Sequence, residues 1–203
     1  QKTTFLMINC EKVPYNDERV RKALAYATNV DALVKVVYGD TATVADCWMS
    51  PSILGYKSEK QIPYDVEKAK ALLKEAGVSN LTVTFGSYEN SVNLAVAEVL
   101  ESMWREVGIT LKLAVTDLAT YSADNNSGNL EISYMNTNAS IPDPSAALLV
   151  WPLNRTISLR HHDQVIQDYL DAGSREYDEV KRVKIYNDLM DYFNEKYYTI
   201  PIA

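Results

Sequence analysis

The sequence lacks any segment suited to a membrane and any excess of positive charge. No apolar run approaches the roughly 18 residues that a bilayer-spanning helix needs. Acidic residues outnumber basic ones by 27 to 20, which gives a formal net charge of −7. A nucleic-acid binder needs a basic face against the phosphates, so no nucleic-acid partner is expected. No secretory leader is visible at the start, which leaves a cytosolic protein or a chain trimmed of its leader.

Residues that carry most enzyme chemistry are also scarce. The two histidines, His161 and His162, are neighbours, so their side chains diverge and would chelate a metal poorly. The sequence has no HExxH, CxxC or GxSxG pattern, and its seven glycines are scattered singly instead of forming a phosphate-binding loop. We therefore expect no catalytic residue, no metal site and no cofactor.

Cysteine occurs only twice, at Cys10 and Cys47. The two could form a disulfide in an oxidising compartment. The alternative is a pair of buried free thiols, because spacing in the sequence does not fix the geometry that a disulfide requires. Both interpretations stay open from the sequence.

What the sequence does contain is a regular alternation of strand and helix patterns. Short apolar or alternating runs predict strands at residues 4–8, 81–85, 109–115, 130–135 and 198–202. Apolar residues at helical spacing predict helices near residues 17–27, 31–38, 65–76, 91–107, 118–125, 163–172 and 175–195. The pattern predicts a single α/β domain over residues 1–203, with a mixed, short-stranded sheet flanked by helices.

An irregular stretch from residue 41 to residue 64 interrupts this alternation, and long ordered loops are often functional. It carries Trp48 and Tyr56, while Tyr88 follows the second predicted strand. Aromatic side chains offer a large contact area with few rotatable bonds, so these three are candidates to line a ligand pocket. The alternative is a loop that its aromatic side chains anchor on the core. Trp104, beside the apolar stripe of the longest middle helix, is expected in the core.

Blocks along the whole chain occur in an order that resembles one protein family. Residues 13–27 read VPYNDERVRKALAYA and residues 64–77 read YDVEKAKALLKEAG. Both are similar to motifs of the ABC-transporter solute-binding proteins of family 5, the oligopeptide, dipeptide and nickel binders. Shorter blocks similar to the same family follow in order at residues 97–113, Asp143-Pro144, 181–191 and 198–202.

The resemblance implies a periplasmic-binding-protein type II-like lobe, the C-terminal ligand-binding lobe of a parent more than twice as long. It implies a periplasmic or lipid-anchored cell-surface parent, whose signal and N-terminal lobe are missing from this chain. A small-molecule or peptide ligand would lie between two lobes that close by a hinge motion, and an ABC permease would receive it. The resemblance thus makes the chain the substrate-binding component of an ABC importer for peptides or related small solutes, and no enzyme.

One segment departs from the family pattern. In peptide-binding members an Asp shortly before the Asp-Pro pair contacts the ligand's amino group, and the matching position here is Ser140. Thr137 stands where Trp is usual. A hydroxyl does not supply the charge that a buried ammonium needs, but uncharged donors and acceptors suit hydroxyl-rich or amide ligands. We expect ligand contacts at Asn136, Thr137, Asn138, Ser140, Tyr88 and Trp48. The alternative for residues 136–140 is a capped turn.

Three classes of function remain open on the sequence. The first is a transport-binding lobe, for peptides or for sugars and other non-peptide solutes. The second is a sensor or chaperone-like binding module built on the same fold. The third is an enzyme whose site is assembled only in space, which a deep pocket containing a carboxylate or histidine of strongly shifted pKa would favour.

Overall fold

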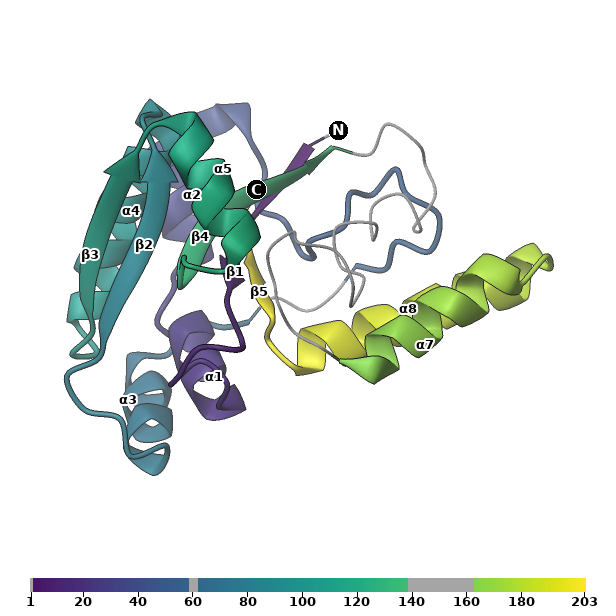
Figure 1. Ribbon diagram of the computed structural model, residues 1–203, viewed down its shortest axis with the longest axis horizontal. Helices are drawn as coiled ribbons and strands as arrows, with labels where there is room; N and C mark the ends of the chain where they lie inside the picture. The colour runs from purple at the N-terminus through teal and green to yellow at the C-terminus, as the bar shows by residue number, and fades with distance from the viewer. Residues whose placement is uncertain (1, 59–61, 139–162) are drawn as a thin grey trace.

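A mixed five-stranded sheet organises the molecule (Figure 1). The computed structural model describes residues 2–58, 62–138 and 163–203. The strands are β1 (Lys2–Ile8), β2 (Thr82–Tyr88), β3 (Thr110–Thr116), β4 (Ile132–Asn138) and β5 (Thr199–Pro201), in the spatial order β3-β2-β4-β1-β5. β2 runs parallel to β3 and β4, whereas β1 runs antiparallel to β4 and β5. The predicted mixed α/β sheet is confirmed.

Each α-helix that the structure describes begins after an Asp or Asn whose side chain accepts a backbone N–H of the first turn. These caps satisfy donors that have no partner within the helix. The helices, each with its cap, are α1 (Glu18–Tyr26, Asp17), α2 (Val30–Tyr38, Asn29), α3 (Val66–Glu75, Asp65), α4 (Ser91–Arg105, Asn90), α5 (Leu118–Ser127, Asp117), α7 (Gln164–Arg175, Asp163) and α8 (Glu179–Glu195, Asp178). A short 3-10 turn, Gly39–Thr41, follows α2. None of these helices is long and apolar enough to cross a bilayer.

Strand β1 is buried on both faces and separates two hydrophobic clusters. Leu6 and Ile8 belong to the first core cluster, which β1 shares with helices α1 to α4 and with strands β2 to β5. Phe5 and Met7 belong to the second core cluster, which lies among β1, residues 47–53 and helices α7 and α8. Both faces are apolar, so the strand reads as a continuous hydrophobic run and not as an alternation.

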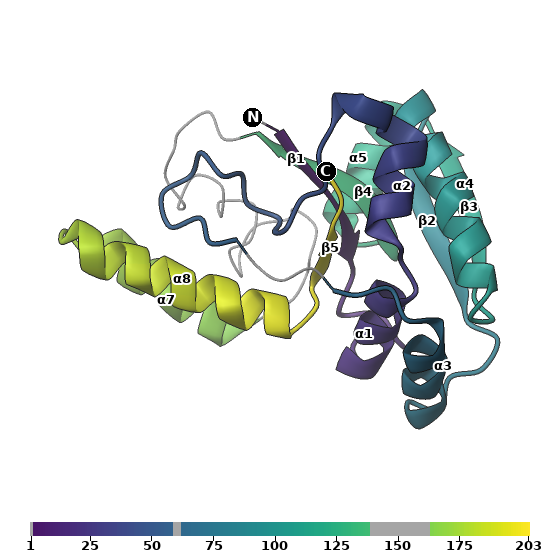
Figure 2. The same cartoon turned by 180° about the vertical axis from the view of Figure 1, so that it is seen from behind.

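The helices cover the sheet unequally (Figures 1 and 2). α2 and α4 lie on one face of the sheet and α5 lies on the other. α7 and α8 pair as a hairpin that extends away from β2 and β3. The rest of the second core cluster fixes the base of this hairpin, where Trp48 packs on Phe193 with ring centroids 5.2 Å apart.

Both cysteines are buried thiols that form no disulfide, so the second interpretation of them is confirmed. Each thiol donates to a nearby carbonyl, Cys10 to Ile8 O at 3.4 Å and Cys47 to Met49 O at 3.1 Å. Burial raises the pKa of Cys10 to about 12, which keeps that thiol protonated and unreactive at neutral pH.

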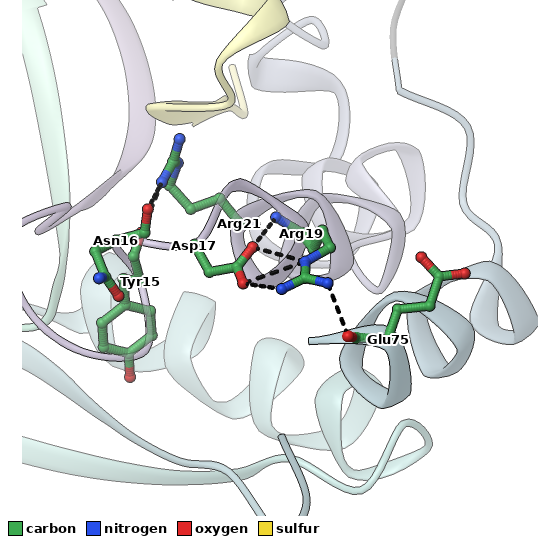
Figure 3. A network of polar contacts seen from close by, with 6 residues as sticks. All are labelled: Tyr15, Asn16, Asp17, Arg19, Arg21 and Glu75. Carbon is green, nitrogen blue, oxygen red and sulfur yellow. Dashed lines mark hydrogen bonds and ion pairs between the residues drawn. The ribbon is translucent and has the colours of Figure 1, made fainter. Parts of the chain in front are cut away.

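The RVR block of the sequence builds a polar network at the start of α1 (Figure 3). Arg21 is only 4% exposed. Its guanidinium donates to the carbonyls of Tyr15 at 2.8 Å, Asn16 at 3.1 Å and Lys196 at 3.0 Å. It also lies 5.3 Å from the ring centroid of Tyr198. Because Lys196 caps the C-terminus of α8, the negative end of that helix dipole helps to hold the buried charge.

Arg19, two residues earlier, is exposed and plays a smaller part. It pairs with Asp17 at 2.6 Å and donates to the carbonyl of Glu75 at the end of α3, at 2.8 Å. Exposed ion pairs contribute little to stability, because water screens them and ordering the side chains costs entropy. Arg21 therefore contributes more to the stability of the fold than Arg19, although both belong to one motif.

Replacing Arg21 by Lys should lower the free energy of unfolding by about 3 kcal/mol. Lysine keeps the charge but lacks the planar fork, so three carbonyls of two separate segments lose their donors. Urea denaturation followed by circular dichroism measures the change. Arg19→Lys is the matched control and should shift the midpoint far less. Equal shifts for the two variants would contradict the assignment of Arg21 as the structural member.

Gly173 in α7 allows close packing against α8. A Cβ at this position would lie 2.5 Å from Cζ of Tyr186, inside van der Waals contact. Glycine to alanine in a helix interior normally stabilises by about 1 kcal/mol. Here we expect Gly173→Ala to destabilise the protein by about 1–3 kcal/mol, because the hairpin must separate to admit the methyl group.

The exposed neighbour Ser174 supplies the control for this prediction. Ser174→Ala should leave the unfolding midpoint unchanged or raise it slightly, since alanine has the higher helix propensity and meets no obstacle. The midpoints of both variants come from the same urea titration. Stabilisation by Gly173→Ala would show that the two helices are not in contact at this point.

Candidate functional site

A cavity of about 440 Å³ opens where strands β2 and β4 end and β1 begins. It is called the strand-end cavity below. Its described wall comes from α2 and the 3-10 turn after it, from β2, α4, α5, β4 and β1, and from Ala203. β4 lies between β2 and β1, and the chain direction reverses between β4 and β1. Ligands of open α/β sheets bind at such carboxyl ends, where the strand order or direction changes.

Tyrosines form the apolar part of this wall. The rings of Tyr88 and Tyr121 are tilted by 58° with their centroids 5.3 Å apart. Tyr121 donates its hydroxyl to the carbonyl of Tyr134 at 3.4 Å, and the hydroxyls of Tyr134 and Tyr38 are hydrogen-bonded to each other. Burial raises the pKa of Tyr121 to about 12 and also raises that of Tyr134. These hydroxyls therefore stay protonated and uncharged throughout the neutral range.

Asparagines form the polar part of the wall. Asn90 caps α4, where its side-chain oxygen accepts the N–H of Val92 at 3.1 Å and of Asn93 at 3.2 Å. This places the positive end of the α4 dipole at the cavity. Asn136, near the end of β4, is exposed and lines the same cavity. Amide side chains both donate and accept, so this wall can pair with carbonyl, hydroxyl or N–H groups of a solute.

The structure brings two of the predicted contact residues together, Tyr88 and Asn136, which both line the strand-end cavity. Thr137 and Asn138 follow in β4, where their backbones pair with Thr3 and Lys2 of β1. Residues 136–138 are therefore strand and not turn. Ser140, the Asp-Pro pair and both histidines lie outside the described residues.

Trp48 does not line this cavity. It is fully buried in the second core cluster against Phe193, which matches the alternative of a loop anchored on the core. Tyr56 anchors the same loop by donating to Asp46 at 2.6 Å. Trp104 is buried in the first core cluster as expected, and its indole N–H donates to Thr28 at 3.0 Å.

Sequence reasoning missed Tyr38, Asn90, Asn93 and Tyr121, which also line the cavity. One signal could have found Asn90 and Asn93. They begin a helix directly after a strand, and such helix starts gather at the carboxyl edge of a sheet. No comparable signal marks Tyr38 or Tyr121, because only the packing of α2 and α5 beside the sheet brings their side chains to this edge.

The described wall offers hydrogen-bonding and aromatic groups. Among residues 2–58, 62–138 and 163–203, no group of three His, Cys, Asp or Glu could hold a metal ion. The cavity lining within those ranges contains no aspartate, glutamate, histidine or cysteine side chain, and Lys2 is its one side chain that is charged at neutral pH. Hydrogen bonding and aromatic contact are what these residues provide.

The chain is similar to known binding proteins over nearly its whole length. The chain is 27% identical to the glutathione-binding protein GsiB of Escherichia coli K12, over 98% of this chain and 41% of that protein. It is 29% identical to the di/tripeptide-binding protein 2 of Pseudomonas aeruginosa, over 99% of this chain and 40% of that protein. The chain thus spans about two fifths of the length of these curated relatives.

A solved structure has the same fold. The periplasmic binding protein DppA of Helicobacter pylori, in complex with the peptide STSA, superposes with a TM-score of 0.93 at 26% identity. The match covers 100% of this chain and 41% of that one. Residues 1–157 match the family described as bacterial extracellular solute-binding proteins, family 5 Middle. That match takes in more than half of the 203 residues, so the chain belongs to the bacterial extracellular solute-binding proteins of family 5.

Proposed function

We propose that this chain is the ligand-binding lobe of the substrate-binding component of an ABC importer for peptides or related small solutes. The observation that carries the proposal is the strand-end cavity, a polar and aromatic hollow at the carboxyl ends of β2 and β4. The relatives support it, because those named above bind glutathione, di- and tripeptides and the peptide STSA.

The cavity serves as one wall of a cleft. Small-molecule sites bury most of the ligand surface, whereas this hollow is partly open to solvent. The chain covers 41% of GsiB and 41% of DppA, which leaves room in a protein of that size for a second lobe. In the proposed mechanism the second lobe closes over the solute by a hinge motion and completes its desolvation. An ABC permease then accepts the loaded, closed form.

The proposed function involves no catalysis. A nucleophile needs a base within hydrogen-bonding reach, and the described lining holds no such pair. The relatives named above are binding proteins as well. In keeping with the extracellular location in the family's name, we place the protein outside the cytoplasm, in the periplasm or anchored to the cell surface.

Variants of Tyr88 and Asn136 test the site in the intact protein that contains this chain. A thermal-shift panel of peptides, sugars and metal ions first identifies a solute that raises the melting temperature, because binding stabilises the folded state by mass action. Tyr88→Ala and Asn136→Ala should each weaken that solute five- to tenfold in calorimetric titration, or ~1–1.4 kcal/mol, by losing an aromatic contact or a hydrogen bond.

Two exposed residues away from the cavity lining provide matched controls. Tyr177 lies between α7 and α8 and is 99% exposed, and Asn16 lies in the turn before α1. Tyr177→Ala and Asn16→Ala should leave the affinity unchanged. Wild-type affinity in both cavity variants, or a panel in which no solute stabilises the protein, would refute the proposed function.

A further inference from the structure

The strand-end cavity, if it binds the transported solute as proposed above, has a wall of unusual electrostatic character. Apart from Lys2, its hydrogen-bonding side chains within the described residues are neutral amides, tyrosine hydroxyls and Thr4 and Thr41. No aspartate or glutamate side chain that could pair with a cationic ligand lies in the lining of the described ranges. A ligand with a free ammonium group would thus find no acidic side chain among the described residues of this wall.

The charges that are present oppose an ammonium group. Lys2, at the start of β1, lines the cavity and carries a positive charge. The N-terminus of α4, a helix of 15 residues, adds the positive end of its dipole through Asn90 and Val92. Like charges brought together in a closed cleft discriminate against the wrong ligand. Both features favour carbonyl, hydroxyl or carboxylate oxygens instead.

The tyrosine rings do not reverse this preference. A cation over an aromatic face is attracted by the ring quadrupole, and Tyr88 could supply such a face. That attraction is smaller than the penalty for removing an unpaired ammonium from water. In addition, the ring of Tyr121 lies beside that of Tyr88, with the centroids 5.3 Å apart and the planes tilted by 58°.

Two acidic residues lie near the strand-end cavity but do not line it. A neighbouring hollow of about 330 Å³ shares Lys2, Thr41, Ala42 and Ala203 with the strand-end cavity and contains Asp40 and Asp46. The carboxylate of Asp46 already accepts hydrogen bonds from Tyr56 and Ser58. Asp40 is exposed on the 3-10 turn after α2. Neither belongs to the cavity wall, and both can be tested by substitution.

We propose that this wall selects an amine-free polar solute, one that presents amide, hydroxyl or carboxylate groups and no free ammonium. The class includes N-blocked peptides and neutral saccharides. It excludes peptides whose free amino terminus would have to be buried at this wall. The inference rests on the proposed function, because it assigns the ligand class of that same cleft.

A matched pair of peptides tests the selection in the intact protein. Tri-alanine and N-acetyl-tri-alanine differ in the charge of one nitrogen, and cellotriose adds a neutral saccharide. Affinities are measured by calorimetric titration at neutral pH, and solute that co-purifies with the protein is released and treated with an amine-reactive label. We expect the acetylated peptide or cellotriose to bind at least tenfold more tightly than tri-alanine, and the co-purified solute to remain unlabelled.

An engineered charge makes the test sharper. Asn136→Asp places a carboxylate on the wall and should improve the affinity for tri-alanine relative to N-acetyl-tri-alanine by at least tenfold. Asp40→Asn should leave the ratio of the two affinities unchanged, and so should Asp143→Asn, which removes the only carboxylate in the sequence between residues 139 and 162.

The outcomes separate the inference from the proposed function. Tighter binding of tri-alanine than of its acetylated form would overturn the inference and leave the binding function standing. A change in the ratio of the two affinities in Asp40→Asn or Asp143→Asn would have the same consequence. If no probe binds and no solute co-purifies, the proposed function fails and the inference fails with it. Binding of an unlabelled solute that Tyr88→Ala weakens supports both.

Discussion

Burial of strand β1 on both faces is the constraint on which the rest of the structure depends. Leu6 and Ile8 anchor one core cluster, and Phe5 and Met7 anchor the other. β1 also pairs along its whole length with β4, whose last residues border the strand-end cavity. A strand held by two cores and two neighbours cannot slip in register without exposing an apolar set of side chains. The position of Asn136 in space is therefore fixed by the pairing of β4 with β1 and by the packing of β1 between the two clusters.

Arg21 complements this hydrophobic constraint with a polar one. Its guanidinium joins the turn before α1 to the end of α8, and through Tyr198 it contacts the segment that leads into β5. The hairpin of α7 and α8 is thereby tied to the sheet as well as to the second core cluster. A rigid scaffold of this kind suits a binding protein, because a wall that is organised before binding loses little entropy when the solute arrives.

Much of this architecture was predictable because the signals are local. Apolar spacing and Asp caps such as Asp17 and Asp65 located helices, and alternation located β2 and β3. Other features depend on tertiary context. Leu113 and Val115 continue the alternation of β3, yet they are 41% and 46% exposed because this strand forms the edge of the sheet. Trp48 and Tyr88 are both aromatic residues outside the apolar stripes of the predicted helices, so the sequence suggests the same role for both. Only the packed structure shows that Trp48 is a core residue and that Tyr88 lines the cavity.

The central claim is that the carboxyl edge of this sheet forms the ligand wall. A crystal structure of the intact protein with its solute bound is the most direct measurement. The account predicts ordered ligand density against the ring of Tyr88 and within hydrogen-bonding distance of Asn136. Ligand density elsewhere, for example in the hollow beside β5 that Asp191 and Thr199 line, with the strand-end cavity left open to water, would contradict it.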